Sequence, residues 1–194
     1  MTEVKYLLVF CIFLNFIVNA LIVGMPILII QKLSLMSKHL GMAESMLGIA
    51  LILSGLVFSI VPIRKNLKLS FLLAFIMQAL VFILLIITQI VSISILVIYS
   101  FVLIGQFILG FSVTLGNIPY QIMLQHLVDE AYKSRVFSVN QSVVSSLVPL
   151  SYTLFGFLLP AFFTETLIVC SIVMLLMIIV FYMKMKPIQT EFEM

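Results

Sequence analysis

The sequence predicts an all-α protein with six membrane-spanning helices, and three observations lead to this fold class. Hydrophobic residues make up 64% of the 194 positions and charged residues only 9%, against roughly 25% charged in an ordinary soluble domain. The mean hydropathy is +1.36. Because a bilayer-spanning helix needs about 20 apolar residues, the chain has room for about six such helices and not for twelve. The same composition excludes a soluble globule, a disordered chain and a coiled coil.

Charged residues divide the chain, taken as one membrane domain over 1–194, into apolar segments that we expect to be the spans. The first begins like a signal peptide, but its apolar run continues to Ile30, which is span length. No formal charge occurs from Leu69 to Val128, so this stretch must hold two helices, with the turn near Thr88, Gln89, Ser92 and Ser94. The expected spans are about 6–30, 44–63, 69–88, 93–118, 136–159 and 166–183.

The basic residues predict that both termini are cytoplasmic, in a cell membrane. With the N-terminus inside, eight of the 10 Lys and Arg fall in inner segments, and only Lys32 and Lys38 fall outside. Six spans then return a tail, 184–194, to the cytoplasm. The net charge of +3 is too small and too scattered for a nucleic-acid partner. The inner-loop residues expected to secure this topology are Arg64, Lys65, Lys68, Lys133 and Arg135.

Polar side chains are unevenly shared among the expected spans, and they should turn away from lipid because unpaired polar groups in hydrocarbon are unfavourable. Spans 1, 4 and 5 carry most of them and form the expected inner set, whereas spans 3 and 6 carry few and are expected at the periphery. Span 2 instead has a seam of small residues that includes Gly48 and Gly55, spaced for close helix approach.

Four amides are the candidate cavity residues. Asn15 and Asn19 lie four apart on one face of span 1, and Gln106 and Asn117 belong to span 4. They either line a substrate cavity or hold the bundle together through interhelical hydrogen bonds of about 0.6 kcal/mol each. For Asn19 and Gln106 we favour the cavity.

The small residues of spans 4 and 5 favour packing. Span 4 contains three glycines before Pro119, at Gly105, Gly110 and Gly116. These glycines either permit the helix to bend or allow a neighbouring helix to pack closely against it. We favour close packing. In span 5, small hydroxyls let backbones approach and can bond their own helix. The serines concerned are Ser142, Ser145 and Ser146.

Catalytic, metal and cofactor signatures are not expected. The sequence has no paired carboxylates, no Cys/His ligand spacing and no phosphate-binding glycine loop. No titratable side chain of the kind a proton-coupled carrier needs falls inside an expected span, so the main coupling site is not expected in this chain. Cys11 and Cys170 should behave as buried hydrophobes. They should lie in opposite halves of the bilayer, too far apart for a disulfide.

The most specific sequence motif lies between spans 4 and 5, at Asn117-Ile118-Pro119-Tyr120-Gln121 and Lys133-Ser134-Arg135-Val136-Phe137-Ser138. Together with Leu14-Asn15-Phe16 and Ser45-Met46-Leu47-Gly48-Ile49, it resembles major facilitator transporters, especially the macrolide-efflux type, over about residues 4 to 183. The loop Val61–Lys68 departs from that family's pattern because it lacks the acid and the glycine.

The resemblance implies the C-terminal six-helix half of an all-α major-facilitator bundle. Spans 1 and 4 would line the cavity, spans 3 and 6 would lie outside, and spans 2 and 5 would face the missing half, packing through the small residues named above. The leading hypothesis is therefore an efflux permease for an amphiphilic small molecule, embedded in the lipid bilayer. Its partner would be an N-terminal six-helix half or a second copy of this chain. The alternative is a non-transporting remnant or an accessory integral membrane protein.

Overall fold

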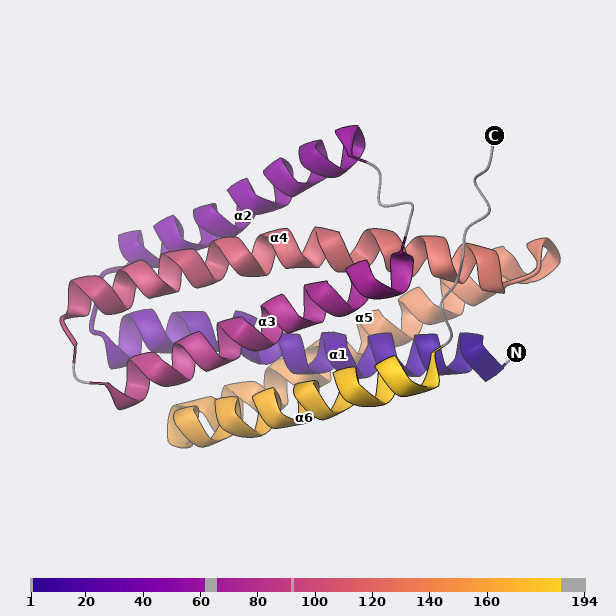
Figure 1. Ribbon diagram of the computed structural model, residues 1–194. Helices are drawn as coiled ribbons and strands as arrows, with labels where there is room; N and C mark the ends of the chain where they lie inside the picture. The colour runs from indigo at the N-terminus through magenta and orange to yellow at the C-terminus, as the bar shows by residue number, and fades with distance from the viewer. Residues whose placement is uncertain (1, 62–65, 92, 186–194) are drawn as a thin grey trace.

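The computed structural model describes residues 2–61, 66–91 and 93–185, and apart from short connections these residues are helical, with no strand among them. Six helices are long and apolar enough to cross a membrane, as the composition predicted (Figure 1). They are α1 (Thr2–Pro26), α2 (Ser37–Ile60), α3 (Leu67–Ile90), α4 (Ile95–Leu127), α5 (Lys133–Ala161) and α6 (Phe163–Lys184). A π-helix, Ile27–Lys32, extends α1, and a 3₁₀ turn, Glu130–Tyr132, precedes α5.

The helices form a layer of four backed by a layer of two. Helix α4 packs along both α2 and α3, α1 packs along α5, and α3 packs along α6, whereas α1 and α4 touch only sparsely. Helices α2, α4, α1 and α5 therefore follow one another in the first layer. Helices α3 and α6 cover one side of it (Figure 1).

Helices α2 and α4 approach each other closely at Gly110. A Cβ at this position would lie 2.5 Å from the Leu47 carbonyl oxygen and 2.9 Å from the Ala50 Cβ. One turn further along the same pair, the Ser54 hydroxyl donates to Thr114 Oγ1 at 2.7 Å. The packing interpretation of the α4 glycines is thus confirmed for Gly110, where only glycine fits.

Aromatic side chains and one lysine hold α6 in place. The rings of Phe10 and Phe181 lie 4.5 Å apart between centroids, and Phe71 lies 5.1 Å from Phe181. The Lys68 ammonium donates to the backbone carbonyls of Tyr182, at 2.8 Å, and of Met185, and it lies over the Tyr182 ring. A residue expected only to secure topology therefore also caps the C-terminus of α6, where a positive charge is favourable.

Several helix boundaries differ from the expected spans. Helix α4 continues to Leu127, so the motif beginning at Asn117, expected to be a loop, forms its last turns. Pro119 does not end α4 because Tyr120, Met123 and Leu124 continue the buried apolar spacing. Helix α2 begins at Ser37, ahead of the expected 44, since Lys38 and Glu44 limit the apolar window but not the helix.

The turn between α3 and α4 also lies later than expected, because α3 runs through Thr88 and Gln89 to Ile90. Residue Ser92 of that turn lies outside the described residues, as do Arg64, Lys65 and the tail from position 186 onward.

The ranking of helices by polarity differs from their burial within this chain. Helices α3 and α1 are the most buried of the six, and α2 and α5 are the least buried. Counting polar residues missed this because α3 buries apolar side chains against α4 and α6, whereas α5 turns most of its hydroxyl groups out of the bundle.

Candidate functional site

Two adjoining cavities lie between α1 and α4 and share Cys11, Asn15 and Asn117 in their walls. The smaller, of about 40 Å³, reaches α3, and the larger, of about 330 Å³, reaches α5. Small-molecule sites measure roughly 300–1,000 Å³. We call the two cavities together the carboxamide groove. It is lined by Cys11, Asn15, Val18, Phe71, Phe75, Gln78, Val113, Gly116, Asn117, Tyr120, Gln121, Phe137, Asn140, Gln141 and Val144.

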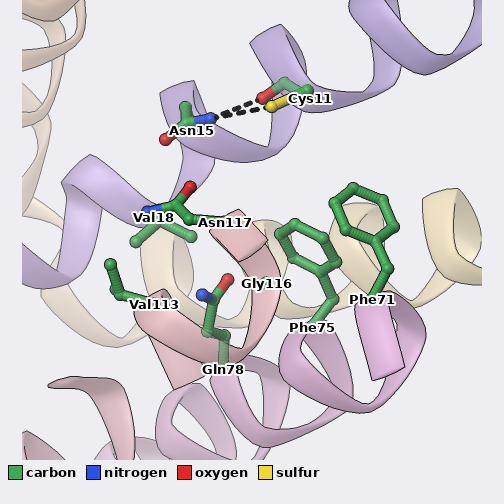
Figure 2. A pocket seen from close by; sticks show the side chains of 9 residues that line it. All are labelled: Cys11, Asn15, Val18, Phe71, Phe75, Gln78, Val113, Gly116 and Asn117. Carbon is green, nitrogen blue, oxygen red and sulfur yellow. Dashed lines mark hydrogen bonds between the residues drawn. The ribbon is translucent and has the colours of Figure 1, made fainter. Parts of the chain in front are cut away.

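The groove forms because α1 and α4 diverge and α3 lies behind the gap. Gly116 allows α3 to approach α4 closely, since a Cβ at this position would lie 3.2 Å from the Ala74 Cβ. Gln78 is one turn further along the same face of α3. Figure 2 shows Gln78 from α3 and Asn117 from α4 reaching into the space beneath α1, with Phe71 and Phe75 beside them.

The polar side chains of the groove form an exposed rim and a buried floor. Asn15, Asn117, Gln121 and Gln141 are exposed and form the rim. On the floor, Gln78 is 4% exposed and Tyr120 is 6% exposed, and Asn140 is half-buried. Because α3 closes the floor, the groove opens on the side of the four-helix layer that faces away from α3 and α6.

Most of the floor's polar atoms lack a hydrogen-bond partner. Asn15, on the rim, donates to the Cys11 carbonyl oxygen at 2.9 Å and to its Sγ at 3.3 Å (Figure 2). In contrast, Gln78 Oε1, the Tyr120 hydroxyl and Asn140 Oδ1 are buried without a partner at hydrogen-bonding geometry. Tyr120 nevertheless lies beside Cys11 and Asn140. An unsatisfied buried polar group costs about 1–3 kcal/mol, and such groups are rare, so the carboxamide oxygens of Gln78 and Asn140 favour a hydrogen-bond donor, from water or from a ligand, in the groove.

The four predicted cavity amides occupy different environments. Asn15 and Asn117 line both cavities, whereas Asn19 and Gln106 line neither. Asn19 is buried and donates from Nδ2 to the Ser151 hydroxyl oxygen on α5 at 2.7 Å. This is the interhelical bond of the alternative interpretation. Gln106 is buried with its Oε1 unpartnered.

The predicted inter-half packing residues lie on surfaces that the described helices leave uncovered. A Cβ at Gly48 or Gly55 would meet no heavy atom of the described chain within 4 Å. The three serines of α5, Ser142, Ser145 and Ser146, are exposed. Two of their hydroxyls donate to the carbonyl four residues earlier, at 2.8 and 2.7 Å. This confirms the expected self-bonding of the helix.

Two of the basic residues assigned to the inner loops lie at the start of α5. Lys133 approaches the Glu130 carboxylate at 3.4 Å, and Arg135 is exposed. Lys5 lies near the start of α1, Lys68 lies near the start of α3, and Lys184 ends α6. These three helix ends lie at the same end of the bundle (Figure 1). The side of the membrane on which this end of the bundle lies stays a prediction.

Sequence reasoning did not assign the floor of the groove. Tyr120 and Gln121 follow Asn117 at helical spacing, but this stretch was taken as a loop. Gln78 is the single amide in the interior of an otherwise apolar span, and such a span was expected at the periphery. Extending the helix beyond Pro119 would have placed Asn117, Tyr120 and Gln121 on one face.

The side chains that line the groove are uncharged. None of its lining side chains is formally charged at neutral pH, and no cluster of His, Cys, Asp or Glu among the described residues has metal-binding geometry. Carboxamides, a phenol and aromatic rings can together hold a molecule that has both hydrogen-bonding and apolar parts.

No protein-family model matches the chain, and no curated protein matches it significantly. The resemblance to major facilitator transporters therefore rests on the quoted residues.

Proposed function

We propose that this chain is the C-terminal six-helix half of a membrane carrier of the major-facilitator type, which expels an amphiphilic small molecule together with a second six-helix half. The observation that carries the proposal is that α3 and α6 expose almost only apolar side chains, whereas α2 and α5 expose small and polar residues among their apolar ones.

One kind of surface suits lipid. Helix α3 exposes a stripe of large apolar residues at alternating spacings of three and four, which places them along one face. Helix α6 exposes apolar residues in the same way, from Ile168 to Met183. A continuous apolar stripe of this length is unfavourable in water and favourable in hydrocarbon. The α3 stripe consists of Leu69, Leu73, Ile76, Leu80, Ile83, Ile87 and Ile90.

The other kind of surface suits a protein partner. Helix α5 exposes Gln141 and the serines named above, and α2 carries a stripe of small residues whose three glycines meet no other helix of the described chain within 4 Å. Polar groups facing lipid are unfavourable, and small residues mark the places where helices in membranes approach one another closely. The α2 stripe comprises Gly41, Ser45, Gly48, Gly55 and Ser59.

The partner surface borders the groove. Helices α2 and α5 are the two ends of the four-helix layer, and the groove opens between its two middle helices, α4 and α1. A second six-helix body seated on α2 and α5 would therefore cover the open side of the groove. This enclosure would turn an exposed rim of amides into one wall of a central cavity.

Site-specific photo-crosslinking in native membranes tests the proposal. A benzophenone side chain at Ser145, on the exposed polar face of α5, is expected to crosslink to a six-helix chain, either a distinct half or a second copy. The matched probe at Leu80, on the apolar face of α3, is expected to crosslink only to lipid. Identical lipid-only products from both positions would refute the proposed partner surface.

Transport is tested separately by co-expression. The DNA flanking the coding sequence is searched for a frame that encodes six spans, and both chains are expressed together. Accumulation of a panel of fluorescent amphiphiles is expected to fall compared with either chain alone. A broken frame, or unchanged accumulation across the panel, would support a non-transporting remnant or accessory protein instead.

A further inference from the structure

We propose that the carboxamide groove binds an uncharged ligand that donates hydrogen bonds through N–H or O–H groups, and that Gln78 on α3 determines its specificity. That this ligand is the transported molecule rests on the proposed function. The binding itself rests on the groove alone.

The unpartnered atoms of the floor determine whether a ligand must donate or accept hydrogen bonds there. Gln78 Oε1 and Asn140 Oδ1 can only accept, and the Tyr120 hydroxyl can accept or donate. A ligand that reaches the floor must therefore supply at least two donors. A molecule with only ether or ester oxygens would leave the two carboxamide oxygens unsatisfied.

The absence of charge along the groove excludes ions as preferred ligands. Moving an ion out of water is unfavourable unless an opposite charge meets it, and no formally charged side chain lines either cavity. Water alone would satisfy the floor atoms. However, a ligand that also has an apolar ring would gain contact with aromatic side chains.

Those aromatic side chains are held rigidly beside the floor. Phe71 and Phe75 line the smaller cavity with Gln78, and their rings pack against each other at 4.7 Å between centroids. The Phe71 ring also stacks on Tyr120 at 6.2 Å. The smaller cavity, of about 40 Å³, has room for a donor group and not for a ring. A ligand with one aromatic ring would therefore place the ring in the larger cavity, which Tyr120 and Phe137 line, and extend a donor toward Gln78.

Gln78 is the residue of this set that the sequence leads one to overlook. Its helix is otherwise apolar and packs as backing to the four-helix layer, yet its side chain is buried and aimed into the groove. The close approach at Gly116 and Ala74 brings it there. Its Oε1 finds no partner in the described chain.

Equilibrium binding to the purified full chain, with any chain that co-purifies, tests the ligand class. The probes are phenyl β-D-glucopyranoside and 4-hydroxybenzamide, each compared with its fully methylated counterpart, which has no O–H or N–H. We expect the donor-bearing probes to bind at least about tenfold more tightly than the methylated ones, the equivalent of one well-made hydrogen bond. Tetraphenylphosphonium and benzoate are expected not to compete.

Two matched variants test Gln78. Gln78→Leu should weaken binding of the donor-bearing probes by roughly 5- to 100-fold, because a ligand donor then loses its acceptor. Gln106→Leu removes another buried, unpartnered amide of the bundle that lines neither cavity, and it should leave binding unchanged. Neither variant should lower the Tm of the empty protein, since each removes an unsatisfied buried group. Tyr120→Phe, which keeps the ring and loses the hydroxyl, provides an independent second measurement.

Three results would overturn the inference: equal binding of methylated and donor-bearing probes, preferential binding of the charged probes, or unchanged affinity in a folded Gln78→Leu variant. Binding of none of the probes would also overturn it, leaving water as the occupant. These outcomes are separable from failure of the proposed function. A six-helix partner crosslinked at Ser145 without donor-dependent binding removes only this inference. Donor-dependent binding without a partner removes only the proposed carrier.

Discussion

Replacing Gly110 with alanine tests the close contact between α2 and α4. The added Cβ would lie 2.5 Å from the Leu47 carbonyl oxygen and 2.9 Å from the Ala50 Cβ. Both atoms belong to rigid parts of α2, so no side-chain rotation can relieve the overlap. An ordinary van der Waals contact begins at 3.4 Å, and α2 must therefore move away from α4 by roughly 0.9 Å at this point.

The expected destabilisation combines three contributions. Overpacking of this kind costs about 1–3 kcal/mol. Separation of α2 and α4 also weakens the hydrogen bond between Ser54 and Thr114, 2.7 Å long and worth about 0.6 kcal/mol in a membrane protein. Against this, alanine favours the helix over glycine by up to about 1 kcal/mol. The free energy of unfolding should fall by about 1–2 kcal/mol, the balance of these terms.

Reversible unfolding by SDS in mixed micelles measures this difference. The matched control is Gly156→Ala on α5, where a Cβ would meet no heavy atom of the described chain within 4 Å. The control should be as stable as the parent, or more stable by up to about 1 kcal/mol through helix propensity alone. If Gly110→Ala proves as stable as Gly156→Ala, α2 and α4 do not touch here, and the order of helices in the four-helix layer is wrong.

Three further outcomes are expected. A double-mutant cycle with Asn19→Ala and Ser151→Ala should give a coupling of about 0.6 kcal/mol in SDS unfolding, and zero coupling would contradict the bond of 2.7 Å between them. Lys68→Met should speed amide hydrogen exchange in the last turn of α6 by about 3- to 30-fold, because about 1–2 kcal/mol of capping is lost. Lys38→Met, on α2, should leave that exchange unchanged, and equal rates in both variants would count against the cap. Finally, Cys11 and Cys170 should both remain free thiols after treatment with a mild oxidant. Alkylation of the unfolded protein, followed by mass spectrometry, measures this. Loss of both thiols to a disulfide would show that they lie closer together than the fold places them.

The helices themselves could be predicted because their signal is local. A run of about 20 apolar residues is sufficient to identify a membrane-length helix, and the described residues contain six such helices, as expected. Ends were harder to place, since a helix stops where its backbone bonding stops and not where its apolar window stops. Pro119 illustrates this point. It resembles a stop signal, yet α4 continues through it to Leu127, because membrane helices tolerate proline when neighbouring groups satisfy the backbone.

The floor of the groove could not be predicted because it depends on contacts between distant segments. Asn15 and Asn117 were identifiable as polar residues within apolar spans. That Gln78 shares a cavity with them depends on how closely α3 approaches α4, which glycine at 116 allows. Asn19 was assigned to the cavity with the same reasoning as Asn15. Only the position of Ser151 on another helix distinguishes the two.

The sparse contact between α1 and α4 has a consequence for the range of molecules that the groove would accept. Helices α2 and α4 form one tightly packed pair and α1 and α5 another, and α3 and α6 bridge the two pairs on one side only. The gap can therefore widen on its open side without breaking either pair. Hydrogen bonds to the floor, in contrast, tolerate errors of only a few tenths of an ångström. We therefore expect the site to accept ligands of different widths but to require a particular spacing of hydrogen-bond donors. Molecules of quite different size would compete with one another whenever they carry two similarly spaced N–H or O–H groups.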